Sequence, residues 1–132
     1  MMRIRIRFLI LLAALILITG CEPKPKNNID KMIVKGRIEG LRKGKLYLQK
    51  IDDTLLVNID STLVKGMPNF SFEIPIETAE IFYLYLEKED GDSLNDRILF
   101  FGEKGTIEIN TLLKTFDSSA EIKGSKNQEL LQ

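Results

Sequence analysis

The densest group of side chains able to do chemistry is the acidic segment Glu87–Asp96 (EKEDGDSLND), which holds five carboxylates around one glycine. Carboxylate oxygens are the ligands that a hard cation such as Ca²⁺ takes, and Asp90, Asp92 and Asp96 are the candidate ligands. The segment lacks the EF-hand spacing, because it has no glycine at the sixth place and no glutamate at the twelfth. We therefore interpret it as a solvated hairpin loop between two apolar strands and predict no metal site.

A second candidate is Asp60-Ser61-Thr62, where hydroxyl groups stand beside a carboxylate. The chain has no histidine, which excludes Ser-His and Cys-His catalysis, histidine metal sites and histidine pH switches. A lysine or carboxylate would have to activate a hydroxyl, and no sequence pattern places one there. We predict no catalytic residue and no cofactor.

The single cysteine, Cys21, excludes an internal disulfide and a Cys-x-x-Cys redox pair. It follows three arginines near the N-terminus and the apolar run Phe8–Ile18. A membrane-spanning helix needs about 20 apolar residues, and this run has 11. The run therefore predicts the core of a cleaved signal peptide, residues 1–20.

The end of that segment, Ile18-Thr19-Gly20-Cys21, resembles the lipobox of bacterial lipoproteins. The resemblance implies cleavage between Gly20 and Cys21 and a lipid anchor on Cys21, held firmly because more than one acyl chain is attached. Glu22 in place of aspartate favours the outer membrane, with the domain facing the periplasm. The alternative is a secreted protein that merely carries a cysteine near its cleavage site, or an ordinary domain start.

Removal of the signal takes away three of the 19 basic side chains and none of the 19 acidic ones, which leaves a net charge of −3. That charge excludes the basic footprint of a nucleic-acid-binding protein. Residues 21–31 then form the lipidated cysteine and a tether, because Glu22–Asp30 (EPKPKNNID) is polar and contains two prolines.

From Met32 onward apolar residues alternate with polar ones, which predicts strands. About seven or eight short strands over 32–124, with no long helical pattern, predict an antiparallel β-sandwich. Gly40–Gly44 is expected to be the turn of a hairpin, and Gly36 to mark a bulge. The runs Ile81–Leu86 and Ile98–Phe101 are expected to be central strands covered on both faces.

The aromatic side chains are expected to lie mostly in the core by alternation. A sugar-binding platform would instead require tyrosines that face solvent. The set comprises Tyr47, Phe70, Phe72, Phe82, Tyr83, Tyr85, Phe100 and Phe101.

Residues 125–132 are expected to start a C-terminal helix, because Ser125 and Gln128 have capping-box spacing. Little more than one turn follows, and so short a helix is not stable alone. We expect the natural polypeptide to continue or the gene to be truncated.

Four segments together resemble a known domain of unknown function: Val34–Leu41, Lys45–Leu48, Ile59–Val64 and Asn69–Phe72. The resemblance is to the β-rich domain that precedes a thioredoxin-like domain in thiol-disulfide oxidoreductase lipoproteins of the AhpC/TSA and TlpA-like group. It covers Met32–Gln132, although Lys65–Phe70 is a looser turn than the family has. In this family the aspartate-serine pair is a strand-end feature, which implies that Asp60 hydrogen-bonds its own backbone.

The resemblance implies a membrane-anchored, non-catalytic module that spaces, orients or supplies contacts for a redox domain. The Cys-x-x-Cys of that redox domain is absent from these residues. The alternative is a stand-alone envelope lipoprotein that binds a glycan, peptide or protein through a sheet edge or loop. It predicts a concave patch of exposed tyrosines or an uncovered edge strand, whereas a smooth, charge-studded surface with every edge protected would count against it.

Overall fold

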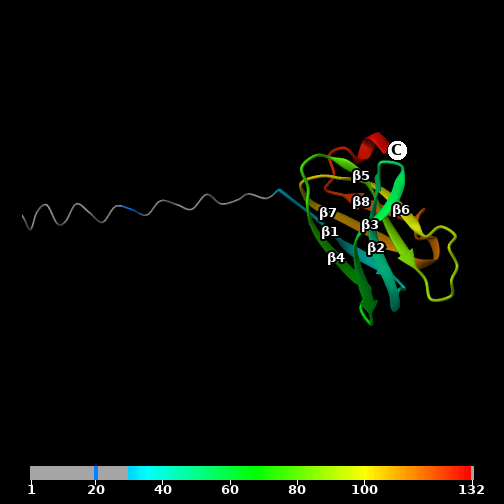
Figure 1. The fold of residues 1–132 in the computed structure, drawn as a ribbon. Coiled ribbons are helices and arrows are strands. Elements are labelled where there is room, and N and C mark those ends of the chain that lie inside the picture. The colour runs from blue at the N-terminus through cyan, green and yellow to red at the C-terminus, as the bar shows by residue number, and fades with distance from the viewer. Residues whose placement is uncertain (1–19, 21–29, 132) are drawn as a thin grey trace, which may run out of the picture.

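A computed structural model describes Gly20 and residues 30–131. The described residues form eight strands and two short 3₁₀ helices (Figure 1). In chain order these are β1 (Lys31–Glu39), β2 (Lys43–Asp52), β3 (Leu55–Lys65), β4 (Asn69–Pro75), β5 (Glu80–Glu87), β6 (Arg97–Gly102), β7 (Gly105–Leu112), η1 (Leu113–Thr115), β8 (Glu121–Lys123) and η2 (Gln128–Leu131). Within this part of the chain, no helix has the length and apolarity to span a membrane.

The strands form two four-stranded sheets, in the orders β4-β1-β7-β8 and β3-β2-β5-β6. All strand pairs are antiparallel except β1 and β7, which run parallel from Met32 beside Gly105 to Glu39 beside Leu112. The prediction of an all-β sandwich is confirmed. The parallel pair is a feature that the alternation of side chains does not reveal, because both pairings have the same period of two.

The core lies between the sheets and is built by strict alternation. In β1, Met32 and Val34 are fully buried, while Lys35 points outward and is exposed. Phe82 from β5 and Phe100 from β6 stack at the centre, with their ring centroids 5.8 Å apart. Such buried aromatic pairs contribute both burial and ring–ring attraction, so they fix how the second sheet packs on the first.

The expected hairpin between the first two strands is wrong. β1 pairs with β4 and β7, whereas β2 pairs with β3 and β5, so the connection crosses from one sheet to the other. Gly40 has φ = +93°, and Leu41 is buried in the core immediately after it. Burial of Leu41 closes the end of the sandwich, which a hairpin turn exposed to solvent would not do.

The prediction of a bulge at Gly36 is also wrong, because the glycine is required there by the close approach of two strands. β1 passes so close to β7 that a Cβ at Gly36 would overlap the backbone carbonyl of Ile109. The β-bulge lies elsewhere, in the β2–β3 pairing, where the register shifts between Leu48 and Gln49 and leaves Ile59 as the extra residue of β3.

The C-terminal segment forms the short helix η2 in the part of 125–132 that the structure describes. Gln128 does not act as the expected capping partner, because its side-chain oxygen accepts a hydrogen bond from the Phe101 backbone N–H at 2.9 Å. Ser125 Oγ is buried and has no hydrogen-bond partner among the described residues. Gln128 therefore attaches this segment to the edge of β6.

Candidate functional site

The outer face of the sheet β3-β2-β5-β6 carries the largest group of partly exposed aromatic and apolar side chains. We call it the tyrosine face and define it by residues of the three strands β2, β5 and β6: Tyr47, Gln49, Ile81, Tyr83, Tyr85, Arg97, Leu99 and Phe101. The register places them in rows across the sheet. Tyr47 lies beside Tyr85 and Tyr85 beside Arg97, while Gln49 lies beside Tyr83 and Tyr83 beside Leu99.

The first row is a stack of rings and a cation. The Tyr47 and Tyr85 ring centroids are 5.6 Å apart with an interplanar angle of 23°. The Arg97 guanidinium lies 4.3 Å from the Tyr85 ring centroid, and the Lys45 ammonium lies 4.8 Å from that of Tyr47. Because Tyr47 and Arg97 come from strands on opposite sides of β5, they cover both faces of the Tyr85 ring. A sugar ring has no open face of Tyr85 on which to stack.

A polar network beneath this row holds Arg97 in place. Gln49 is only 6% exposed, and its amide nitrogen donates to Asn58 Oδ1 at 2.7 Å. Its amide oxygen accepts from Arg97 Nε at 3.4 Å, and Arg97 Nη1 pairs with the buried Asp96 carboxylate at 2.9 Å. A planar guanidinium held at several points loses little freedom when a ligand binds it. The network therefore orders the polar part of the face in advance.

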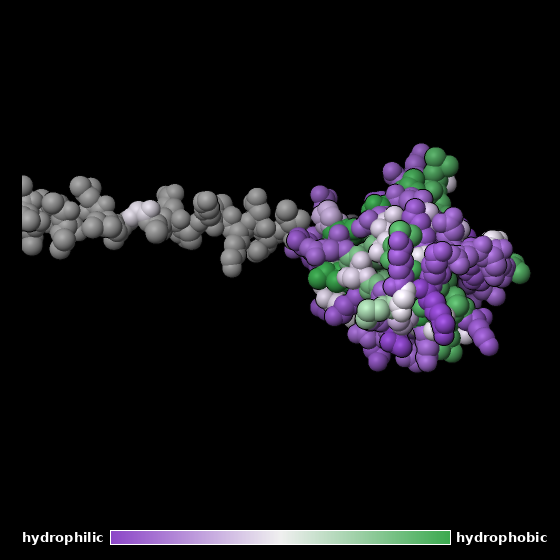
Figure 2. All heavy atoms as spheres, turned by 90° about the horizontal axis from the view of Figure 1, so that it is seen from below, coloured by the Kyte–Doolittle hydropathy of each residue, from purple (hydrophilic) through white to green (hydrophobic). Residues whose placement is uncertain are grey.

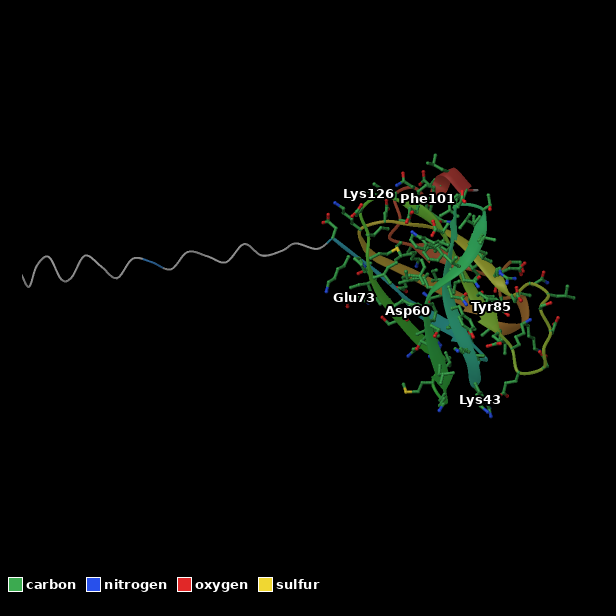
Figure 3. All side chains as sticks on the ribbon, viewed as in Figure 1. Lys43, Asp60, Glu73, Tyr85, Phe101 and Lys126 are labelled. Atoms are coloured by element: carbon green, nitrogen blue, oxygen red, sulfur yellow. The ribbon has the colours of Figure 1, made fainter. Side chains whose placement is uncertain are left out.

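The other end of the same sheet is apolar. Ile81 is 41% exposed and Leu99 39%, and the adjoining Ile51 and Leu56 are 54% and 44% exposed. Phe101 is half-buried beside Ile81. Phe101 and Lys126 lie at the end of the sandwich that holds the C-terminal segment, and Lys43 lies at the opposite end (Figure 3). The face therefore changes from aromatic and charged to aliphatic along its strands.

The outer face of the second sheet differs in composition. Its exposed positions are mainly charged or polar, with Lys35 and Arg37 on β1, Glu73 on β4 and Glu108 on β7. The side of the molecule seen in Figure 2 is likewise mainly hydrophilic, with hydrophobic residues in small separate groups. Grouped apolar side chains on one face only are typical of a surface that contacts another molecule.

The expectation that the aromatic side chains lie mostly in the core is therefore wrong for the tyrosines. Phe70, Phe72, Phe82 and Phe100 are buried as expected, whereas Tyr47, Tyr83, Tyr85 and Phe101 are half-buried on the outer face. The expectation that β5 and β6 are covered on both faces is wrong for the same reason. Neither strand has a further layer over its outer face among the described residues, and β6 is an edge strand.

The acidic segment forms the loop between β5 and β6, as predicted, but its three candidate ligands do not converge. Asp90 Oδ1 accepts from the Asp92 N–H and Asp92 Oδ1 from the Leu94 N–H, both at 3.0 Å. Asp96 is 4% exposed and faces Arg97. Across residues 30–131, no three His, Cys, Asp or Glu side chains gather as a metal site would require. Within this loop, the Glu89 carboxylate accepts a hydrogen bond from the exposed Lys43 ammonium and raises the pKa of Lys43.

The hydroxyl candidates have structural partners. Asp60 Oδ1 accepts from the Ser61 backbone N–H at 2.8 Å, which confirms that Asp60 bonds its own backbone, although the pair lies in the middle of β3 and not at a strand end. A cleft of about 630 Å³ beside β7 and β8 contains Thr111 and Ser119. Their hydroxyls bond to each other and to the backbone carbonyls of Phe116 and Thr115. These groups close a turn.

Of the two residues at the predicted cleavage and lipidation site, the structure describes only Gly20. Gly20 is exposed and lies outside any helix or strand. Cys21 lies outside the described residues, so its lipidation stays a prediction. The sequence analysis did not identify Gln49 and Arg97 as functional residues. Each is a long polar side chain at an outward position of its strand, and each lies beside a tyrosine of β5. That combination is the signal that could have identified them.

A family model described as "Domain of unknown function (DUF4369)" matches residues 32–131. That range nearly coincides with the range of the resemblance noted above, Met32–Gln132. No curated protein and no solved structure matches the chain.

Proposed function

The chain belongs to the DUF4369 family of domains of unknown function, and on that premise we propose that it is a lipid-anchored, non-catalytic module that recognises a protein partner. The partner is a thioredoxin-like domain of a periplasmic thiol-disulfide oxidoreductase, as the resemblance of the sequence implies. The observation that supports recognition of a partner is the tyrosine face, an ordered aromatic surface on one sheet of a domain whose other outer face is charged. The choice of a thioredoxin-like partner rests on the resemblance of the sequence, because exposed tyrosines are also what the alternative predicts.

A protein fits this face better than a glycan does. Protein interfaces are enriched in tyrosine, phenylalanine and arginine at their centres and have polar rims. The tyrosine face has that composition, with Arg97 preordered by Asp96 and Gln49. A glycan platform needs a free aromatic ring face, and both faces of the Tyr85 ring are covered, which leaves Tyr83 and Phe101 as the rings of this face on which a sugar could stack.

The anchor supports the same role by restricting where the domain lies. Glu22–Asp30 comprises nine residues, which span at most about 30 Å when fully extended. The tether joins the sandwich at Asp30, whose carbonyl accepts from the Ile76 N–H and whose carboxylate pairs with Lys104. A lipid on Cys21 would hold the domain close to the outer membrane, where its partner meets it at high effective concentration.

The second candidate function is a stand-alone envelope lipoprotein that binds an extended polypeptide. The observation that favours it is the β3 edge, which pairs with no strand on its outer side within residues 30–131. Edge strands of this kind accept a peptide by strand addition.

Site-specific photo-crosslinking in membranes would test the proposal. A benzophenone side chain at Tyr83 in the full-length chain is expected to crosslink a protein with a thioredoxin fold and a Cys-x-x-Cys, identified by mass spectrometry. The matched control carries the same group at Lys35, which faces outward on the charged sheet. Equal or absent crosslinking at both positions would refute recognition through the tyrosine face. A product without a thioredoxin fold would refute the redox partner.

The anchor has its own test. Cys21→Ala is expected to abolish incorporation of a labelled fatty acid and to release the domain from the membrane fraction. A mature protein that begins at Met1, measured by mass spectrometry, would overturn the assignment of the lipobox.

A further inference from the structure

β3 is the longest strand of the domain, and most of it is exposed. It has 11 residues, and only Val64 is buried. In the described chain β3 pairs with β2 alone, so no strand covers its outer side, although the Ser61 N–H donates to Asp60 Oδ1 at 2.8 Å. Leu55 is 69% exposed and Leu63 61%, which leaves large aliphatic side chains along this side. Such an edge is a template for an added strand.

The other edges of the two sheets offer less. Gln128 occupies part of the β6 edge through its bond to the Phe101 N–H. β8 has only three residues. β4 has seven residues and ends at Pro75, which cannot donate a backbone hydrogen bond. Among the four edges, β3 alone combines length, exposure and apolar side chains.

We propose that two copies of this chain pair through β3, antiparallel, about a two-fold axis that passes between the two Ser61 residues. The pairing joins two four-stranded sheets into one of eight strands, in which each copy presents the same residues to the other. It uses the edge of the sheet and leaves the tyrosine face open, so it is independent of the proposed thioredoxin-like partner, whereas it occupies the edge that the second candidate function gives to an extended polypeptide.

The order of side chains along β3 is self-complementary about Ser61. Ser61 lies beside Tyr47 and Leu63 beside Lys45 on the outer side of the sheet, while Ile59 is the extra residue of the bulge and is 37% exposed. The axis at Ser61 therefore sets Leu63 of each copy against Ile59 of the other. Leu63 is 61% exposed and Ile59 37% in the single chain, and the pairing covers all four of these side chains.

Charge supports the same register. With the axis at Ser61, the exposed Asp60 stands opposite Thr62, whose hydroxyl is a hydrogen-bond donor for the carboxylate. An axis one residue earlier would set Asp60 against Asp60, and like charges directly opposed across strands are destabilising. The bulge at Ile59 ends the regular stretch, so the pairing centres on 59–63 and does not extend to the start of β3.

Disulfide trapping tests the register directly. Residues opposed across an antiparallel pair have Cα atoms about 4.5–5.5 Å apart, which falls within the range of a disulfide. Ser61→Cys in the full-length chain, in isolated membranes under mild oxidation, is expected to form a disulfide-linked dimer. Ser71→Cys is the matched control, because Ser71 is an exposed serine on β4, an edge strand of the other sheet. The expected yield is at least about tenfold higher at position 61 than at 71. Equal yields would overturn the proposal.

A charge-reversal pair provides the second test. In the Ser61→Cys background, the double variant Ile59→Lys with Leu63→Lys places a lysine of each copy opposite a lysine of the other copy at both contacts. This variant is expected to abolish the trapped dimer. Ile59→Glu with Leu63→Lys opposes unlike charges and is expected to restore it. Loss in both double variants would refute the register. Both positions are exposed, and the unchanged circular dichroism of each variant would show that the fold is intact.

Discussion

Gly36 is the position where the smallest substitution should have the largest effect. In the parallel pairing of β1 with β7, Gly36 lies opposite Ile109. A Cβ at Gly36 would overlap the Ile109 carbonyl oxygen and would also crowd the carbonyl carbon and amide nitrogen of the same residue. These are backbone atoms of a paired strand, so they cannot rotate away as the end of a side chain can.

The cost of Gly36→Ala follows from that geometry. Inserting a methyl group into a close-packed interior costs about 1–3 kcal/mol when neighbours can adjust. Here the two strands must move apart, so we expect about 3 kcal/mol, at the upper end of that range. For a domain of about 100 residues this corresponds to a decrease in melting temperature of roughly 12–24 °C.

The measurement is thermal and urea unfolding of the mature chain carrying Cys21→Ser, followed by circular dichroism. Gly66→Ala is the control, because Gly66 has φ = +76° but no atom within 4 Å of the point that a Cβ would occupy. It should cost only the strain of a left-handed conformation, about 1–2 kcal/mol. A Gly36→Ala variant as stable as the wild type would refute the steric account, and so would a Gly66→Ala variant that loses as much stability as Gly36→Ala.

Three further variants test other parts of the structure. Phe100→Ala removes one ring of the central stack and should destabilise the domain by about 3–5 kcal/mol in urea unfolding, whereas an effect below about 1 kcal/mol would mean that the ring is not in the core. Arg97→Met leaves the Asp96 carboxylate buried without its ion pair and should cost about 1–3 kcal/mol. Asp96→Asn in the Arg97→Met background should recover part of that loss, and no recovery would contradict the proposed pairing. Lys43→Met should leave the melting temperature unchanged at neutral pH, because the ion pair with Glu89 is solvent-exposed. The Glu89 carboxylate raises the pKa of Lys43. Any stabilisation by this ion pair is therefore present while the lysine is protonated and disappears as the pH rises through the raised pKa. An NMR titration in which Lys43 loses its proton before other exposed lysines would disprove the raised pKa.

Local alternation was enough to predict the strands but not their partners. Met32, Val34 and Ile38 identify the buried side of β1, and Phe70 and Phe72 that of β4, because burial depends on the side-chain period. Nothing in that period shows that the chain between Gly40 and Gly44 crosses to the other sheet. That crossing depends on the burial of Leu41, a tertiary contact.

The tyrosine face could not be predicted for a related reason. Tyr83 and Tyr85 lie in an apolar run whose inward residues are Phe82, Leu84 and Leu86. When the outward positions are aromatic, a strand that is covered on one face can have the same continuous apolar sequence as a strand that is covered on both. The distinction depends on whether another layer covers the sheet, and sequence-local patterns do not contain that information.

The parallel pairing of β1 with β7 determines the order in which the chain can fold. Arg37 and Asn110 meet across a sequence separation of 73 residues, and β4 is the only other neighbour of β1 among the described strands. A chain that becomes available N-terminus first can therefore form only the β1–β4 ribbon of this sheet until β7 is present. Contacts between residues far apart in sequence form slowly. During that interval one side of β1 is an open strand edge, which favours aggregation until β7 pairs with it.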